Sequence, residues 1–399
     1  MDFAGLLTAA EAPSEAPAQP ASAAHAGQRW SDPHTWPEGP PAPGSTVRIE
    51  RGRTILLDQD IDVAGLHIEG TLRVARRDTR IAAGWILVQA DGRFEAGTAG
   101  QPFDRALRIT LCSAEQGSAP HPQLGRKFLA AIDGGTIELH GEQRSSWVPL
   151  GTTVAPGHCT LRLAQPVDWR DGECIAVASG ADHSLVEERA IAMIGADRLT
   201  LTLERPLAHR HHGSHAPLQH RVSGSVAKAL LLHRNIVVEG CEDSERGGQG
   251  GHCMIGSAEV GAAVQRHAVG RFSGVEFRRM GQLNCPGRYP LLWCNNGEAA
   301  DSEVSGCLVR DCYQRGIVTA GSPHVRISDN VVLKPYGHGF IVEAGDDSPQ
   351  FIASNLAVRP RVARFADSTM RGYGEHRPRA FWVVRQPPSR AAAQPLRAQ

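Results

Sequence analysis

The chain has 399 residues, with 42 Lys and Arg against 42 Asp and Glu, so its formal net charge is zero. This balance disfavours a nucleic-acid-binding protein, which usually carries a basic excess or a basic stripe. No run of about 18 apolar residues occurs, so no membrane-spanning helix is expected. The 43 glycines and 26 prolines predict many turns and few long helices.

The first segment, residues 1–27, is rich in Ala, Pro, Ser and Glu. It lacks the basic start and the continuous apolar stretch of a secretory signal, so we expect a disordered leader. The nine cysteines are spread along the chain without C-x-x-C spacing. A disulfide scaffold or a structural zinc site is therefore not expected, and thiols buried in a β core are the simpler interpretation.

Short apolar-alternating segments recur along the chain at a nearly constant period. In the first half the repeat is marked by Gly70, Gly92 and Gly135, with spacings of 22 and 43 residues. In the second half, Ile317 is followed 23 residues later by the similarly placed Phe340. Periods of roughly 20–25 residues with short strands and Gly or Asn turns are typical of a β-solenoid.

The predicted fold class is all-β, a right-handed parallel β-helix that includes the N-terminal coils. A β-sandwich also contains many short strands, but the constant spacing favours the solenoid. In such coils Asn330 and Asn355 are expected in turns, where their side chains bond the backbone of neighbouring coils. If the 23-residue register holds, Glu343 stacks on Ala320.

Motifs in a long, fixed order resemble the G-eight (G8) domain and the cell-surface hyaluronidase family, which also includes the cell-migration-inducing hyaluronan-binding proteins. The motifs that carry this resemblance are Trp30-Ser-Asp-Pro-His-Thr-Trp36, Gly70-Thr-Leu72, Gly134-Gly-Thr-Ile-Glu-Leu-His-Gly141, Asp168-Trp-Arg170, Arg234-Asn-Ile-Val-Val-Glu-Gly240, Gly250-Gly-His252, Arg288-Tyr-Pro290, Val309-Arg-Asp311 and Gly337-His338.

Residues 386–399 are rich in Pro, Ala, Arg and Gln and are expected to form a disordered tail. The resemblance implies a G8 domain over 28–150 and a parallel β-helix over 151–385. It also implies an extracellular or cell-surface location and a polysaccharide partner such as a glycosaminoglycan. The pattern shows no clear terminal cap, so a truncated member of a longer family is expected. Neither oligomeric state nor cofactor is assigned, and a divalent metal stays an option.

The chain departs from the family pattern where histidines are expected. After Arg-Tyr-Pro the family has an aliphatic residue, a histidine, an aromatic residue and a second histidine. Here the stretch is Leu291-Leu292-Trp293-Cys294, so both histidines are replaced. A metal needs three or more protein ligands, so no metal ligand is assigned.

The residues that remain suggest one cleft on the C-terminal coils. Polysaccharide cleavage needs a general acid and base within reach of the scissile bond, or groups that neutralise a uronic acid. Trp293 is the most interesting aromatic platform, because it lies where the family histidines would be. The candidate catalytic residues are Arg288, Tyr289, Arg315, His338 and Glu343; the candidate substrate-binding residues are Trp293, Asp311, His252 and Arg310.

A cluster of five histidines lies between residues 209 and 220, flanked by Pro206 and Pro217. Such a cluster could bind a transition metal, but its spacing matches no fixed site. Histidines on a surface loop are the simpler interpretation.

Two functions follow from the sequence. The preferred one is a non-catalytic or degenerate polysaccharide-binding or structural β-helix, because the histidines at positions 292 and 294 are missing. The alternative is an enzyme, hydrolase or lyase, that degrades a glycosaminoglycan-type polysaccharide.

Overall fold

The computed structural model describes residues 27–112, 119–180, 182, 184–214, 226–257, 266–344, 351–362 and 378–385. Within these ranges the elements are strands β1–β32, a 3-10 helix η1 (Pro33–Thr35) and one short α-helix, α1 (Ser244–Gly247). The predicted leader, up to residue 26, and the predicted tail lie outside the described residues.

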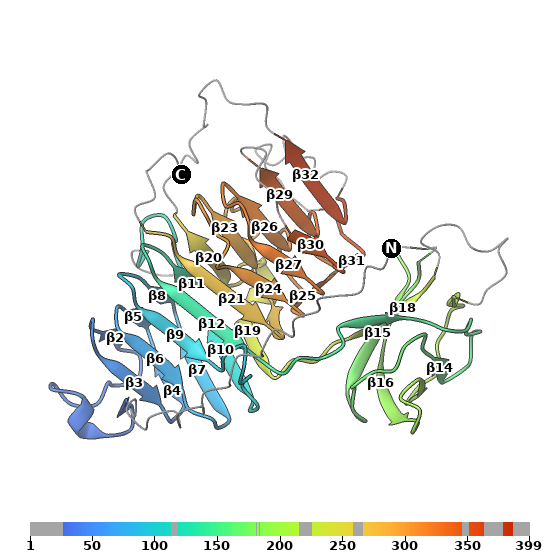
Figure 1. Cartoon of the computed structure of the whole chain (residues 1–399), viewed down its shortest axis with the longest axis horizontal. Coiled ribbons are helices and arrows are strands. Elements are labelled where there is room, and N and C mark those ends of the chain that lie inside the picture. Colours follow the sequence, from blue (N-terminus) through green and yellow to red (C-terminus); the bar gives the residue numbers. More distant parts are fainter. Residues whose placement is uncertain are drawn as a thin grey trace, which may run out of the picture.

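Most strands belong to three parallel sheets, named A, B and C (Figure 1). Each circuit of the chain adds one strand to sheet B, then one to sheet A and then one to sheet C. Each circuit forms one coil, so the predicted all-β, parallel β-helix fold is confirmed. Sheet A contains β1 (Gln28–Arg29), β3 (Thr54–Leu57), β6 (Thr71–Val74), β9 (Arg93–Ala96), β12 (Thr136–His140), β21 (Val269–Ser273), β24 (Glu303–Ser305), β27 (Arg326–Ser328) and β30 (Phe351–Ala353). Sheet B contains β2 (Thr46–Ile49), β5 (Gly65–Ile68), β8 (Ile86–Val88), β11 (Phe128–Ala131), β20 (His252–Gly256), β23 (Leu291–Cys294), β26 (Ile317–Ala320), β29 (Phe340–Ala344) and β32 (Phe381–Arg385). Sheet C contains β4 (Ile61–Val63), β7 (Thr79–Ala83), β10 (Leu107–Leu111), β19 (Ile236–Gly240), β22 (Val275–Arg278), β25 (Leu308–Arg310), β28 (Val331–Leu333) and β31 (Leu356–Val358).

An antiparallel module interrupts the coils between β12 and β19 and stands beside the β-helix (Figure 1). It has its own core around the fully buried Trp169. This corrects the expectation of continuous parallel coils over 151–385, because antiparallel pairing runs up to residue 231. The module comprises β13 (Trp147–Pro149), β14 (Thr160–Arg162), β15 (Cys174–Ala178), β16 (Val186–Ile194), β17 (Thr200–Leu203) and β18 (Lys228–Leu231).

The 23-residue register predicted for the C-terminal coils is confirmed. Ile317 pairs with Phe340, and Ala320 pairs with Glu343 in the same pair of strands. Inward side chains therefore stack on their equivalents in the next coil and form one continuous core.

The glycines that mark the N-terminal repeat have a steric cause. A Cβ atom on Gly92 would lie 2.3 Å from the carbonyl oxygen of Ile68, and one on Gly135 would lie 2.2 Å from that of Val88. Each glycine therefore lets a turn approach the backbone of the preceding coil, which no larger residue permits.

The predicted asparagine contacts between coils are also present. Asn330 accepts a hydrogen bond from the Cys307 N–H at 2.9 Å and donates to the Val304 carbonyl at 2.9 Å. Asn355 repeats the pattern one coil later, donating to the Ile327 carbonyl at 2.7 Å. These side chains satisfy backbone groups that the turn leaves unpaired.

Candidate functional site

The outer face of sheet B is apolar over its central strands. On it lies an outer apolar cluster, separate from the interior core. Its buried members are Leu87, Leu124, Phe128, Ala130, Met254, Tyr289, Leu292, Val318 and Ile341, with Trp85, Ile132, Cys294 and Trp382 partly buried at its margin.

Sheet A and strands β10, β19 and β22 of sheet C carry charge ladders on their outer faces. Further along sheet C the outward side chains are apolar and pack against the antiparallel module; they are Leu308, Val331, Leu333 and Val358. On sheet A, Arg93 bridges Glu95 at 2.7 Å and Glu138 at 2.6 Å. On sheet C, Glu239 accepts bonds from Arg108 at 2.7 Å and Arg278 at 2.5 Å. Burial opposes ionisation of Glu239, but these guanidinium contacts outweigh it and lower its pKa.

The two positions where the family resemblance places histidines lie on the outer face of sheet B. Leu292 pairs in register with Met254 and Val318, and all three belong to the outer apolar cluster. Cys294 lies at the margin of the same cluster. Strand β23 therefore presents apolar and thiol groups where imidazoles would be needed for chemistry.

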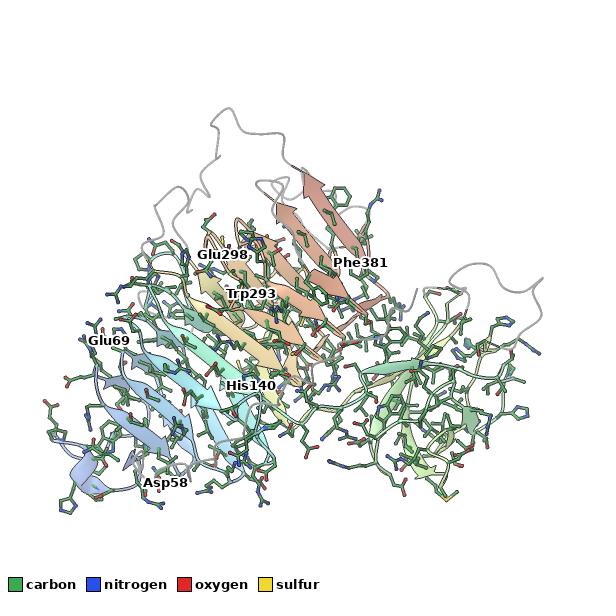
Figure 2. The ribbon with its side chains drawn as sticks, viewed as in Figure 1. Asp58, Glu69, His140, Trp293, Glu298 and Phe381 are labelled. Atoms are coloured by element: carbon green, nitrogen blue, oxygen red, sulfur yellow. The ribbon has the colours of Figure 1, made fainter. Side chains whose placement is uncertain are left out.

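Trp293 points the other way, and the structure corrects its predicted role as a sugar platform. Its side chain is 0% exposed and lies in the interior core, as Figure 2 also shows among the coils. Its ring packs edge-on against Phe272, with centroids 6.0 Å apart. No face of the indole is open to a sugar.

Three of the predicted catalytic residues, Tyr289, Arg315 and His338, each lie two residues before a strand of sheet B, β23, β26 and β29 respectively. The Arg315 guanidinium carbon lies 5.1 Å from the Tyr289 ring centre, and the His338 carbonyl accepts the Gly316 N–H at 3.0 Å. Tyr289, Arg315 and His338 are 6%, 2% and 0% exposed. These three side chains therefore cannot contact a polymer in this structure.

Arg288 and Glu343 are placed differently from these three residues, and the His338 side chain has its own partners. Arg288 is partly exposed and donates to the Gln282 side chain at 2.8 Å. His338 Nδ1 accepts the Arg379 N–H at 3.1 Å, and its ring packs on Trp382 with centroids 4.9 Å apart. Glu343 occupies the predicted position beside Ala320.

His252 was predicted to bind substrate, but it is 1% exposed and is therefore corrected to a structural residue. Its Nε2 lies 2.8 Å from the Leu124 carbonyl oxygen, which ties the loop before β11 to β20. Burial lowers the pKa of His252 to about 4, with a further lowering by Arg288. The ring is neutral at physiological pH and acts as a donor to that carbonyl.

We expect this histidine to make the protein acid-sensitive. Because the pKa is about 4 in the folded state and near 6.5 when unfolded, the unfolded chain binds the extra proton first. Its contribution is intact above pH 6.5 and is lost as the pH falls toward 4, by roughly 3 kcal/mol at most. Urea unfolding at pH 7.5, 5.5 and 4.5 measures this loss. His252→Gln should flatten the pH dependence, whereas His34→Gln, at an exposed site, should keep it; equal slopes in all three proteins would contradict the assignment.

Two polar clefts lie where the antiparallel module meets the β-helix. The first, of about 600 Å³, is lined by Trp147, Asp168, Gln143, Ser305 and Asp329 among others. Trp147 donates from its indole to the Ser354 carbonyl at 3.0 Å, so the module contacts the C-terminal coils there. The sequence did not predict this junction.

The second cleft, of about 580 Å³, contains one predicted binding residue, Arg310, together with Arg170, His233 and Glu188. Arg310 bonds Glu276 at 2.8 Å and Asp311 at 2.7 Å. The predicted residue Asp311 is half exposed beside it. Arg310 and Asp311 are thus predicted residues that lie beside an open polar cleft.

The histidine cluster is partly structural. His211 is fully buried, with Nε2 3.0 Å from Glu187, and this corrects its expected place on the surface. Glu187 also accepts the N–H groups of Ala208 and His209 at 2.8 and 3.0 Å. His215 and His220 lie outside the described residues. Within the described ranges, no three His, Cys, Asp or Glu side chains converge as a metal site would require.

Family models match both halves of the chain. A G8 domain model matches residues 35–151, and a CEMIP beta-helix model matches residues 248–381. The chain is a G8 domain protein with a CEMIP beta-helix. The antiparallel module falls mainly between the two matched regions.

Relatives match most of this chain at moderate identity. Human Fibrocystin-L is 30% identical over 393 residues, covering 89% of this chain and 9% of the relative. A G8 domain-containing protein of Dictyostelium discoideum is 26% identical, covering 82% of this chain and 29% of the relative. Fibrocystin of Canis lupus familiaris is 27% identical, covering 79% of this chain and 8% of the relative. The chain thus spans less than a third of the length of these relatives.

Among solved structures, a Pseudomonas phage phi297 tailspike is similar over 69% of this chain and 41% of its own, at 13% identity and a TM-score of 0.24. That score is too low to carry an argument.

Among the described residues, no helix has the length and apolarity to cross a membrane.

The sequence contains a signal for the outer apolar cluster, which is the lack of alternation in two strands of sheet B. Strands covered on both faces are continuously apolar, whereas half-exposed strands alternate. The strands Phe128–Ala131 and Leu291–Cys294 of sheet B are apolar throughout, whereas Arg93–Ala96 of sheet A carries charged residues at alternate positions.

Proposed function

We propose that this G8 protein is a non-catalytic polysaccharide-binding β-helix that acts outside the cell. The observation that carries the proposal is the packing of Leu292 and Cys294 in the outer apolar cluster, where the family resemblance places histidines. The thioether of Met254, the aliphatic side chain of Leu292 and the thiol of Cys294 supply neither a general acid–base pair nor a metal site. The resemblance to cell-surface hyaluronidases supports the ligand class and the location.

The clefts beside the antiparallel module are the surfaces that suit a saccharide. The first combines the aromatic ring of Trp147 with amide, hydroxyl and carboxylate groups, which is the mixture that binds a sugar through its apolar face and its hydroxyls. The second offers Arg170 and Arg310, which suit a uronic acid carboxylate.

The experiment combines a binding and a cleavage assay on the purified full chain. Polysaccharides, hyaluronan included, are incubated with the protein with Ca²⁺ or with EDTA, and both polymer size and gel retardation are measured. Retardation without loss of size supports the proposal. Size loss by the unmodified protein overturns it, and so does the absence of both retardation and cleavage.

Two variants assign the binding surface. Trp147→Ala should weaken retardation if the first cleft binds, and Arg170→Ala should weaken it if the second cleft binds. If both variants retard glycan like the unmodified protein, neither cleft is the binding surface. The double variant Leu292→His/Cys294→His tests whether imidazoles at these two positions are sufficient for cleavage.

The second candidate function is a glycosaminoglycan-degrading enzyme, hydrolase or lyase. It is favoured by the cation–π contact of Arg315 with Tyr289 and by the position of His338 before the next strand of sheet B. In that case His338→Ala should abolish size loss of the polymer while leaving the unfolding transition cooperative.

A further inference from the structure

Two cysteines far apart in the sequence end neighbouring strands of sheet C. Cys112 follows β10 and Cys241 follows β19, and these strands pair in parallel up to Leu111 and Gly240. The Cys241 N–H donates to the Leu111 carbonyl at 3.3 Å, so the pairing continues past the strand ends. The two cysteines are therefore the next pair in register.

This placement matches the requirements of a disulfide. Paired strands lie about 4.8 Å apart, within the roughly 4.4–6.8 Å that separates the Cα atoms of bonded cysteines. The Cys241 thiol is near enough to Cys112 to raise the pKa of its thiol. Cys112 is exposed and Cys241 is half-buried, so an oxidant in solution can reach the pair. By contrast, Cys253, Cys307 and Cys312 are enclosed in the core.

We propose that Cys112 and Cys241 are a dithiol pair that closes to an intrachain disulfide between successive coils of sheet C. The oxidant is a small-molecule disulfide such as oxidised glutathione. One cysteine thiolate attacks it and releases one glutathione thiol, and the second cysteine then attacks the mixed disulfide and releases the other. The protein loses two protons and two electrons, and the glutathione disulfide gains them.

The bond would enclose the antiparallel module. The chain between Cys112 and Cys241 contains β11, β12 and the whole module, so the disulfide would tie together the coils on either side of the insertion. Cross-links that close long loops restrict the unfolded chain most, which stabilises the folded state. The inference is independent of the proposed ligand, because it rests on strand register alone.

The chemistry predicts a slow reaction at neutral pH. Although part of the Cys112 side chain is exposed, partial desolvation of its thiol raises the pKa to about 11, and the neighbouring Cys241 thiol adds to the rise. The Cys112 thiolate is therefore scarce at pH 7, and its attack on the oxidant should be about 100-fold faster at pH 9, because a rise of two pH units below the pKa increases the thiolate fraction by that factor.

The test uses the reduced full chain treated with oxidised glutathione at pH 7 and pH 9, then alkylated and mapped by mass spectrometry without reduction. The expected result is one linked peptide pair joining Cys112 to Cys241, with a thermal midpoint several degrees above that of the reduced protein. Cys174→Ser, which removes another exposed thiol, should keep both effects. Cys112→Ser should lose both.

The proposal is overturned if Cys112 and Cys241 are recovered at pH 9 as separately alkylated thiols or as two glutathione adducts. It is also overturned if Cys112→Ser shows the same oxidant-dependent midpoint as the unmodified protein. Because each variant is compared with itself in reduced form, a variant that is less stable still gives a valid difference.

Discussion

Replacing Trp293 by alanine is expected to lower the free energy of unfolding by about 3–5 kcal/mol, as large truncations in a packed core do. The indole is fully buried in the interior of β23 and packs on Phe272. Its removal would leave a cavity that the stacked coils on both sides cannot close, because their backbones are fixed by strand pairing. Urea unfolding followed by circular dichroism measures the loss.

Trp293→Phe is the matched control. Phenylalanine keeps an aromatic ring in the core and removes the indole Nε1–H, which is buried and has no acceptor among the described residues. The loss of stability should therefore be clearly smaller than for alanine. If the alanine variant instead unfolds at the same urea concentration as the unmodified protein and loses only glycan retention, Trp293 is a surface platform and the core assignment is wrong.

Replacing Arg234 by methionine is expected to cost about 3 kcal/mol or more, because buried carbonyl oxygens lose their charged donor. The Arg234 side chain donates to the Gly306 carbonyl at 2.8 Å, to the His233 carbonyl at 2.7 Å and to Ser146 Oγ at 3.0 Å. These partners join a turn of the β-helix to both ends of the antiparallel module. Methionine fills a similar volume but donates nothing, so urea unfolding isolates the lost hydrogen bonds.

The variant should also loosen the junction locally. Amide hydrogen exchange is expected to speed up in residues 141–146, 231–235 and 305–307, and glycan binding in the first cleft should fall, since Ser146 and Gly306 line it. Arg162→Met is the control, because Arg162 is exposed and its ion pair with Asp197 should contribute less than about 1 kcal/mol. Equal stability of the two variants would contradict the role of Arg234.

The sequence could predict the repeat because coil stacking imposes its own pattern. Inward residues such as Ile317 and Phe340 must be apolar in every coil, and Gly92 must lack a Cβ atom to pass the Ile68 carbonyl. Both requirements recur at the coil period and are visible without coordinates. The same period placed Glu343 beside Ala320 and brought Arg315 next to Tyr289 and His338.

The direction and burial of each side chain were decided only by the tertiary structure. A period of 23 residues says which residues stack, but it does not say that Trp293 faces the core while Leu292 faces outward. Nor does it say that His252, Tyr289, Arg315 and His338 are covered. Burial depends on what packs against a strand from elsewhere in the chain, and local sequence holds little record of those partners.

The antiparallel module and the cysteine pair show the same limit over longer distances. The segment between β12 and β19 has short alternating strands like those of the coils, so its pattern alone could not reveal antiparallel pairing. Because β19 returns to the register that β10 left, Cys112 meets Cys241 across the whole insertion. By itself the sequence determined the coil and its period. Which distant residues meet was decided by where the chain rejoins the β-helix. The reason is that the contact between β10 and β19 is set by the pairing of backbone groups and not by local preference.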